Sequence, residues 1–465
     1  MNAFTKLVEH SKKVANFGHL LEIVGWDQAA VMPSGGAEAR SNAMAELEVH
    51  IHSLMTQPHL EDLFAQAEEE TLATQERAML REMKREWRTQ RANNDWAGFE
   101  KNWAEVVKLS QEEAQIRADA NGTTPYDAML NVYEPGTTSA SLDTLFSDVK
   151  TWLPSLIDEA IEKQKSNNIL LPNGHYPAEK QKALGLQVMK LLQFDFEHGR
   201  LDESVHPFCG GVPTDVRITT RYDESEFMQS LMGIVHETGH ARYEQGLPKE
   251  LAGTPAGEAR SMGIHESQSL FFEMQIGRNN AFIDHLARLA SNHFSGNEFA
   301  KDNLAKIYTR VEKGFIRVDA DELTYPAHVI LRYEIERDLM NGVIKHTDVP
   351  ELWNEKMKAY LGLSTEGNFK NGCMQDIHWT DGSFGYFPSY TLGAMYAAQF
   401  MAAMKKTIDV DGVIQSGDLS PIFTWLSDNI WSKGSLLTTD ELVKHATGET
   451  LNAQHFQAHL KSRYL

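Results

Sequence analysis

The chain has 465 residues, of which 42% are hydrophobic and 9% aromatic, enough to bury a large core. Its 65 acidic residues outnumber its 44 Lys and Arg residues, and the formal net charge is −21. Such a balance disfavours contact with nucleic-acid phosphates, which requires a basic surface. No run of the sequence approaches the roughly 20 apolar residues of a membrane-spanning helix. We therefore expect neither nucleic-acid nor membrane partners.

Cysteine usage indicates the compartment. The two cysteines, Cys209 and Cys373, lie far apart and form no CxxC pair. This usage is typical of a reducing compartment rather than of a disulfide framework. The first residues lead into a charged amphipathic segment without an apolar leader core. These features predict a cytoplasmic protein.

Helical patterns dominate the first part of the chain. Apolar residues recur at helical spacing over residues 1–24 and again over 37–56. A long, highly charged helix with a solvated outer face is expected over 71–118. An amphipathic stretch over 142–165 is expected to kink or restart at Pro154, because proline removes one backbone donor. This part is therefore predicted to form a wall of solvated helices.

No internal repeat and no long linker divides the chain. The sequence pattern changes at Leu170, where residues 170–174 form a turn cluster. We expect a single domain over residues 1–465, in which residues 1–195 form the helical wall and residues 196–465 carry the functional site.

The strongest strand signal lies at Asp215–Tyr222, after a Gly-rich segment, His206–Gly211, that is expected to be a loop. β-branched residues alternate there with polar ones, which places Val216 and Ile218 on one face and Arg217 on the other. A strand at the entrance of a functional helix can hold an extended peptide by backbone pairing. The alternative is an ordinary edge strand.

The next segment, Asp223–Gly246, is predicted to form a helix. Asp223 and Glu226 have the spacing of a capping box, which satisfies free backbone N–H groups at a helix start. Apolar residues at helical spacing mark a buried face. Gly246, followed by Pro248, marks the end of the helix.

This helix contains the sequence His236-Glu237-Thr238-Gly239-His240. Residues four apart lie on one face of a helix, so His236 and His240 can offer two imidazole nitrogens to one cation. Glu237 lies beside the metal rather than on it. This is the HExxH arrangement of zinc hydrolases, with two ligands and one general base. The alternative is a solvated polar face with a coincidental histidine pair.

A catalytic zinc ion needs a third protein ligand and a position for water. The ligand is expected on a later helix, which disfavours Glu244, one turn past His240 on the same helix. Residues 261–278 have the pattern of the next helix, and spacing within it favours Glu266 only modestly. The acidic candidates are Glu250, Glu258, Glu266 and Glu273.

Several segments together resemble the carboxypeptidase Taq family of thermostable metallocarboxypeptidases. The block Gly263–Ser269, with the sequence GIHESQS, follows the HExxH sequence, and the early stretch Trp26–Pro33 is also similar to that family. Four further stretches are similar, in order, to its HPF, DxRxT, IRxxAD and GxxQDxHW motifs: His206–Phe208, Asp215–Thr219, Ile316–Asp321 and Gly372–Trp379. These motifs span most of the chain, so the resemblance covers its whole length.

The resemblance implies one zinc ion per chain, replaceable by Co²⁺ or another divalent ion, held by His236, His240 and Glu266. It implies Glu237 as general base and acid. It also implies a mainly α, zincin-like single-domain fold with a small antiparallel β-sheet beside the active-site helix. The implied function is removal of single amino acids from free peptide C-termini with broad specificity, by a homodimer.

The chemistry requires two further groups. The tetrahedral oxyanion needs a donor besides the metal; the candidates are His378, Tyr386 and Tyr390, and the resemblance favours Tyr390 and His378. A free carboxylate is best recognised by the guanidinium fork of arginine. Arg317 is our first choice and Arg217 our second. The alternatives are a structural ion pair for Arg317 and core packing for the tyrosines.

Other functions stay open on the sequence alone. A dipeptidyl carboxypeptidase also uses HExxH with a later Glu, and would anchor the carboxylate one residue further from the metal. A non-catalytic helical scaffold with a structural zinc would usually need four protein ligands, often cysteines. An aminopeptidase would need acidic groups for a free amine, and no such motif is present. Asp376 is expected to orient a histidine.

Overall fold

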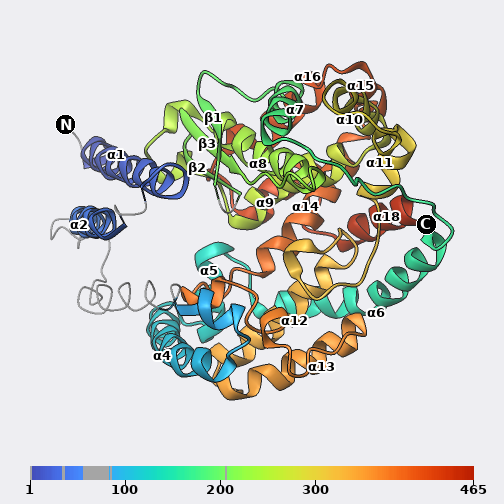
Figure 1. Cartoon of the computed structure of the whole chain (residues 1–465). Coiled ribbons are helices and arrows are strands. Elements are labelled where there is room, and N and C mark those ends of the chain that lie inside the picture. Colours follow the sequence, from blue (N-terminus) through green and yellow to red (C-terminus); the bar gives the residue numbers. More distant parts are fainter. Residues whose placement is uncertain (1–2, 34–36, 56–82, 84–85, 205–206) are drawn as a thin grey trace.

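The computed structural model describes residues 3–33, 37–55, 83, 86–204 and 207–465. Helices make up most of it, with one small sheet beside them (Figure 1). The predicted mainly α fold is therefore confirmed. Among the described residues, no helix combines the length and the apolarity needed to cross a bilayer.

The N-terminal part is helical, as the periodicity predicts. Its helices are α1 (Ala3–Ala30), α2 (Ala37–Met55), α4 (Trp96–Asn121), α5 (Pro125–Tyr133), α6 (Ser139–Gln164) and α7 (Ala178–Leu191). The long charged helix expected over 71–118 lies partly outside the described residues. Its described part is interrupted at Asn94, where φ is 56°, and α4 begins after Asp95, whose side chain accepts from the N–H of Gly98.

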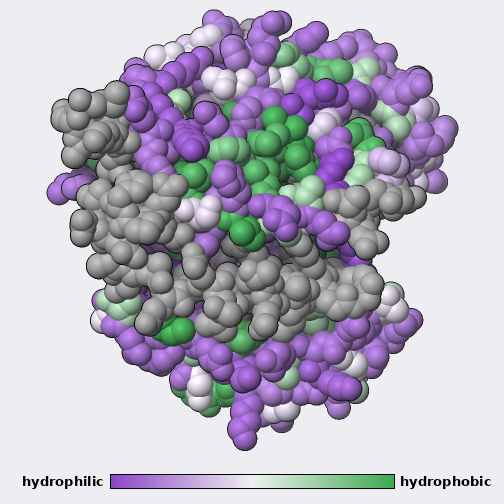
Figure 2. Space-filling view, turned by 90° about the vertical axis from the view of Figure 1, so that its left-hand side faces the viewer, coloured by the Kyte–Doolittle hydropathy of each residue, from purple (hydrophilic) through white to green (hydrophobic). Residues whose placement is uncertain are grey.

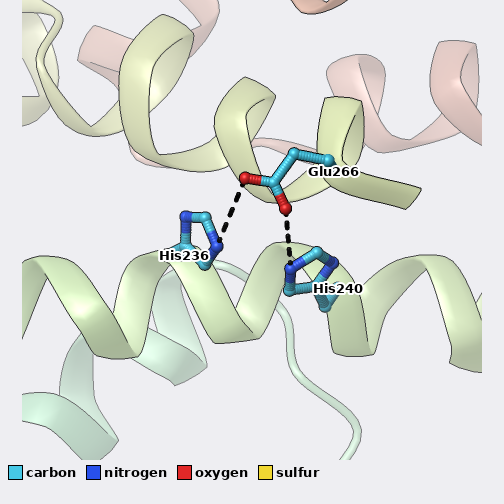
Figure 3. A group of neighbouring side chains, drawn as sticks. All are labelled: His236, His240 and Glu266. Atoms are coloured by element: carbon cyan, nitrogen blue, oxygen red, sulfur yellow. Dashed lines mark ion pairs between the residues drawn. The ribbon is translucent and has the colours of Figure 1, made fainter. Parts of the chain in front are cut away.

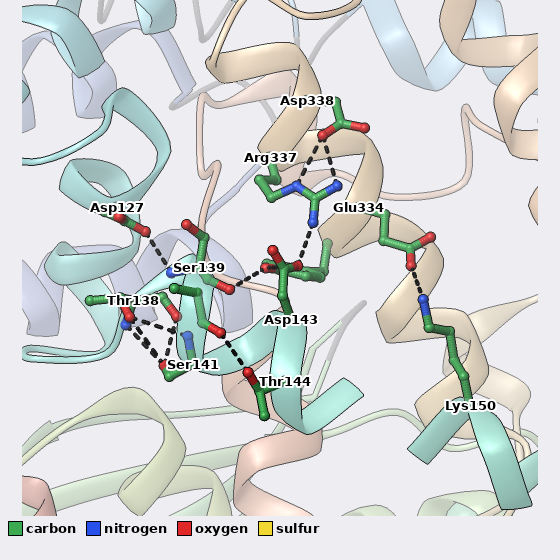
Figure 4. A network of polar contacts seen from close by, with 12 residues as sticks. Asp127, Thr138, Ser139, Ser141, Asp143, Thr144, Lys150, Glu334, Arg337 and Asp338 are labelled. Atoms are coloured by element: carbon green, nitrogen blue, oxygen red, sulfur yellow. Dashed lines mark hydrogen bonds and ion pairs between the residues drawn. The ribbon is translucent and has the colours of Figure 1, made fainter. Parts of the chain in front are cut away.

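Helix α6 continues through Pro154 without the predicted restart. Proline removes one backbone hydrogen bond, but Leu153 and Ile157 on either side of it are buried in the core. Ion pairs join α6 to α12 (Tyr325–Met340) (Figure 4). Lys150 Nζ lies 2.6 Å from Glu334 Oε1, and Arg337 of α12 contacts Asp143 of α6. Tertiary packing therefore helps to keep this helix continuous across its proline.

The sheet contains the predicted strand at its centre. Within the described residues, β1 (Gly199–Glu203) pairs parallel with β3 (Asp215–Thr220), and β2 (Phe208–Val212) pairs antiparallel with it. The sheet is thus mixed rather than purely antiparallel. Part of the expected Gly-rich loop forms β2, and His206 lies outside the described residues. Because β3 is paired on both sides, it is no edge strand and has no free side for a peptide.

The sheet packs on α8 (Met228–Gly246), the predicted HExxH helix. Val216 and Ile218 of β3 are fully buried with Ile234 and Ala241 of α8 in a cluster of their own. The alternation of residues in β3 therefore predicts its buried face correctly. Figure 1 shows α8 and the sheet in one half of the molecule, with α12 and α13 (Val349–Leu361) in the other.

A larger core joins the two halves of the chain. Its buried side chains come from both the expected wall and the later part, for example Trp103 of α4, which stacks on Trp379 at 5.5 Å between ring centroids. The remaining α-helices are α9 (Met262–Leu270), α10 (Asn280–His293), α11 (Lys301–Tyr308), α14 (Pro388–Met404), α15 (Val410–Ser416), α16 (Ser420–Asn429), α17 (Thr439–Thr447) and α18 (Ala453–Tyr464).

The coloured part of the face in Figure 2 is mostly hydrophilic toward its edges, and hydrophobic side chains gather nearer its middle. Cys209 and Cys373 are both free, as their spacing predicts.

Candidate active site

Helix α8 begins later than predicted and ends where predicted. Asp223 and Glu226 form an isolated β-bridge rather than a capping box, and the helix starts at Met228. The carboxylate of Glu226 still accepts from the N–H groups of Met228 and Gln229, at 2.6 and 3.1 Å, so it satisfies two helix-start donors. The last helical residue is Gly246.

Three side chains of two helices converge as a metal-ligand group (Figure 3). His236 and His240 lie on one face of α8, and Glu266 of α9 points toward both. The Nε2 atoms of the two histidines lie 3.9 and 3.4 Å from the two carboxylate oxygens of Glu266. Ligands bonded to one zinc ion at its usual distances would be about 3.3 Å apart. Among the described residues, this is the one group of three or more with metal-ligand spacing.

Two glycines allow α9 to approach its neighbours closely. A Cβ added at Gly239 of α8 would lie 2.5 Å from the carbonyl oxygen of Gln268. A Cβ added at Gly393 of α14 would lie 2.7 Å from the Cγ of Glu266 itself. Only hydrogen atoms fit at these two positions, so α8 packs closely on α9 at Gln268 and α14 packs closely on Glu266 itself.

Each ligand histidine has its own support. His236 Nδ1 lies 2.9 Å from Glu273, whose other oxygen accepts from Arg278 at 2.7 Å. A carboxylate in this position fixes the ring and leaves Nε2 for the metal. Glu273 is therefore a supporting group rather than a ligand. It lies in a π-helical turn, Phe271–Gly277. Burial alone would raise the pKa of its carboxyl, but Arg278 and His236 outweigh burial and lower the pKa below its usual value.

The second support runs through a third histidine. The Nδ1 atoms of His240 and His265 lie 2.6 Å apart, and His265 Nε2 lies 2.8 Å from Glu244 Oε1. These distances fit a chain in which His240 donates to His265 and His265 donates to the carboxylate. Glu244 is thus away from the ligand group, as its place on α8 predicts, and His265 supports a ligand rather than binding the metal.

Glu237 lies beside the ligand group and is 8% exposed. Burial raises the pKa of its carboxyl to about 7. It lines a cavity of about 610 Å³ together with His236 and Glu266. The apolar part of the cavity wall includes Met228, Met232, Leu270, Met274, Ile307 and Val318. This volume suits a short peptide segment rather than a folded protein.

Arg317 lines the same cavity, whereas Arg217 does not. The Nε of Arg317 donates to Asp376 Oδ1 at 2.8 Å, and its Nη1 donates to the hydroxyl of Tyr325 at 2.6 Å. Arg217 instead donates to both oxygens of Asp215, at 3.0 and 2.9 Å. The structure therefore separates the two arginines and brings only Arg317 to the metal cavity.

The three oxyanion candidates form one aromatic group. Tyr390 lines the cavity, and its hydroxyl lies 3.0 Å from His378 Nε2. Tyr386 packs on both, with ring centroids 5.4 Å from His378 and 5.2 Å from Tyr390. Tyr390 is therefore the candidate that reaches the cavity, and His378 lies behind it.

Within the described part of the chain, the Asp376 carboxylate accepts hydrogen bonds from two arginines and from no histidine, contrary to expectation. It lies between Arg317 and Arg332, and Arg332 Nε donates to its Oδ2 at 2.6 Å. The strong attraction of two guanidinium groups exceeds that of an imidazole here. Sequence reasoning did not identify Arg332 or Tyr325, because a single Arg or Tyr in a helix has no distinguishing spacing.

A helical fold with two histidines of one helix, a glutamate of the next and a glutamate beside them defines a metallopeptidase. The carboxypeptidase Taq (M32) metallopeptidase model matches residues 6–90 and 79–464. Thermostable carboxypeptidase 1 of Thermus thermophilus is 35% identical over 99% of this chain and 98% of its own. Carboxypeptidase 1 of Bacillus subtilis is 33% identical over 97% of this chain and 96% of its own.

Solved structures agree with this match. Metallocarboxypeptidase 1 of Trypanosoma cruzi has a TM-score of 0.96 and 45% identity, over 99% of each chain. The carboxypeptidase of Pyrococcus furiosus has a TM-score of 0.93 and 30% identity, over 100% of this chain and 99% of its own. The chain belongs to the carboxypeptidase Taq (M32) metallopeptidase family. It is a metallocarboxypeptidase, and its substrates are peptides.

Proposed function

We propose that the protein removes single amino acids from the free C-terminus of peptides with broad specificity. One Zn²⁺ per chain, replaceable by Co²⁺, is held by His236, His240 and Glu266. The observation that carries this proposal is the convergence of one ligand atom from each of these three side chains within 4.8 Å of one another. His236 and Glu266 also line a cavity together with Glu237 and Arg317.

The chemistry divides between the ion and the chain. When bound, the zinc ion lowers the pKa of its water toward about 7 and polarises the scissile carbonyl. Glu237 takes a proton from the attacking water and gives it to the leaving amine. Its buried position supports this role, because burial brings the pKa of its carboxyl to about 7 and a base works best near the operating pH.

Tyr390 donates to the oxyanion that forms on the substrate. Burial lowers the pKa of His378 to about 4, so its imidazole is neutral. With its proton on Nε2, His378 donates to the oxygen of Tyr390 at 3.0 Å and leaves the tyrosine proton for the substrate. Tyr386 packs against both rings and contributes to the substrate wall.

Arg317 binds the terminal carboxylate. It is only 5% exposed, and a buried guanidinium discriminates strongly between a charged and a neutral terminus. Arg217 has no part in this step, because it does not line the cavity and pairs with Asp215 instead.

The whole chain, residues 1–465, acts as one catalytic domain, because residues 1–195 and 196–465 both contribute side chains to the larger core. A homodimer and a cytoplasmic location complete the proposal; two free cysteines support the latter.

The rival function is a dipeptidyl carboxypeptidase. Digestion of an N-terminally blocked peptide series, followed by mass spectrometry, separates the two. Mass losses of one residue per step support our proposal, and losses of two residues contradict it. A non-catalytic scaffold with a structural zinc does not fit a metallopeptidase family, and neither free cysteine belongs to the ligand group.

A further inference from the structure

One aspartate is shared by two buried arginines behind the cavity. Asp376 Oδ1 accepts from Arg317 Nε at 2.8 Å, and Oδ2 accepts from Arg332 Nε at 2.6 Å. The side chains of Arg317, Arg332 and Asp376 are 7%, 0% and 4% exposed. Solvent therefore screens none of these charges appreciably.

The charges of this group do not cancel. Two guanidinium groups face one carboxylate, which leaves one uncompensated positive charge. The nearby imidazoles add nothing to it, because burial lowers the pKa of His328 to about 3 and that of His378 to about 4. An uncompensated buried charge is costly unless a ligand or solvent meets it.

Of the two arginines that carry the excess positive charge, only Arg317 can contact a ligand in the cavity. Arg332 lines no described cavity, and its Nη1 donates to the carbonyl of His328 at 2.7 Å. Arg317 lines the cavity, and within the described part no hydrogen bond involves its Nη2. A carboxylate bound in the cavity can therefore reach Arg317 but not Arg332.

We propose that Arg332 is a positioning residue for the substrate carboxylate. Arg332 donates to one oxygen of Asp376, so the charge of this carboxylate is shared between two arginines and does not fully neutralise Arg317. The same contact holds Asp376 where its other oxygen orients the Arg317 guanidinium. This inference rests on the proposed role of Arg317 as the carboxylate anchor. It adds that the strength of the anchor is set by a second arginine that never touches the substrate.

A purely structural role is the competing explanation. The guanidinium of Arg332 lies 4.5 Å from the ring of Trp353 and 5.4 Å from that of Phe387. If only this packing mattered, loss of Arg332 would weaken binding of charged and neutral peptide ends alike. If Arg332 acts through charge, its loss weakens binding of the charged end selectively.

The test measures binding without turnover. Zinc-loaded full-length protein carrying Glu237→Gln is titrated calorimetrically with N-acetyl-Ala-Ala-Leu and with its carboxamide. Loss of one buried, charge-assisted interaction weakens binding by about 10–100-fold. We expect Arg332→Met to weaken binding of the acid by about 10-fold and that of the carboxamide by less than about 2-fold. Equal losses for both ligands would overturn the proposal.

A matched control lies on the same helix. Arg337 of α12 pairs with Asp143 and Asp338, and its guanidinium lies over the ring of Tyr333 at 5.5 Å. It is absent from the cavity lining. Arg337→Met should leave the ratio of acid to carboxamide affinity unchanged. A change as large as that of Arg332→Met would show that loss of any α12 arginine suffices, which would overturn the proposal.

Charge balance also predicts compensation. Adding Asp376→Asn to Arg332→Met leaves Arg317 as the single charge of the group, so affinity for the acid should recover by at least about 3-fold. Structural damage would instead accumulate in the double variant, and a further loss would overturn the proposal. If Arg332→Met does not fold, Arg332→Lys provides the measurement: it keeps the charge and should retain the acid preference. Loss of that preference in a folded Arg332→Lys protein would overturn the charge argument.

The two proposals fail separately. If Arg317→Met leaves the acid preference intact, the carboxylate anchor of the proposed function is wrong. If Arg317→Met abolishes the preference but Arg332→Met does not alter it, the anchor stands and the role of Arg332 is wrong.

Discussion

The two proposed binding regions of the cavity carry opposite kinds of charged group. In the metal region, Glu237, Glu266 and Glu273 surround two histidines. Burial alone would lower the pKa of His236, but these carboxylates raise it to about 10, and Arg278 pairs with Glu273. In the other region, two arginines share Asp376. Carboxylates thus predominate where we propose a divalent cation, and guanidinium groups where we propose the substrate carboxylate.

Among these tests of the two regions, removal of the metal should have the largest effect on peptide hydrolysis. Dialysis against a chelator is expected to abolish peptide hydrolysis, because no metal ion is then present to polarise the scissile carbonyl and activate water. Stoichiometric Zn²⁺ or Co²⁺ should restore the rate, measured on a blocked peptide alongside metal content. Persistent hydrolysis by metal-free protein would contradict the proposed mechanism.

Glu237→Gln is expected to lower kcat by about 10²–10⁴-fold, the usual contribution of a general base. The amide keeps the shape of the side chain but cannot take a proton. Bound zinc, measured by metal analysis, should stay at one equivalent. Glu250→Gln is the matched control, because Glu250 is an exposed glutamate just past α8. Undiminished turnover in Glu237→Gln would refute the base assignment.

Glu273→Gln should weaken zinc affinity by about 10–100-fold, as is usual for the partner of a ligand histidine. Glu273 contacts His236 directly, whereas Glu244 acts on His240 only through His265. Glu244→Gln should therefore weaken zinc binding less. Competition with a fluorescent chelator measures both constants. The reverse order would mean that the relay through His265 is the stronger support.

Glu336, near Asp376, should affect the pH dependence of stability rather than catalysis. It is fully buried, accepts from Trp379 Nε1 at 2.7 Å and from the N–H of Gly385 at 3.1 Å, and burial raises its pKa to about 8. Its proton is retained in the folded protein above the unfolded pKa of about 4.3, so this group's stabilisation is complete below that pH and falls as pH rises toward about 8.

Glu336→Gln should remove this dependence. The free energy of unfolding of the wild type, relative to the variant, should decrease by up to about 1.4 kcal/mol per pH unit between about pH 5 and 8. Urea unfolding of both proteins at several pH values measures the difference. Parallel curves would show that Glu336 is ionised, and it would then offset the positive excess near Asp376.

Local patterns in the sequence predict local structure well. Val216 and Ile218 lie on the predicted buried face, and Gly246 ends α8 as its lack of a side chain suggests. The pairing of β3 could not be predicted, because a parallel partner is determined by the path of the chain through β1. The start of α8 was misplaced because Asp223 and Glu226 also satisfy the geometry of a bridge.

The candidate site shows the same division. Spacing alone predicts the histidine pair, and the resemblance adds Glu266, which the structure places opposite the pair. Asp376 and Arg217 differ from expectation because their partners, Arg332 and Asp215, are determined by which side chains meet in space. The local charge balance depends on such tertiary contacts, and residue spacing within one segment cannot predict it.

The glycines that face α9 have one further consequence. Gly239 faces the backbone of α9 and Gly393 faces the Glu266 side chain at its Cβ and Cγ, so the absence of two Cβ atoms lets Glu266 lie close to both α8 and α14. A single extra carbon at position 239 or 393 would therefore push Glu266 away from the histidine pair of α8.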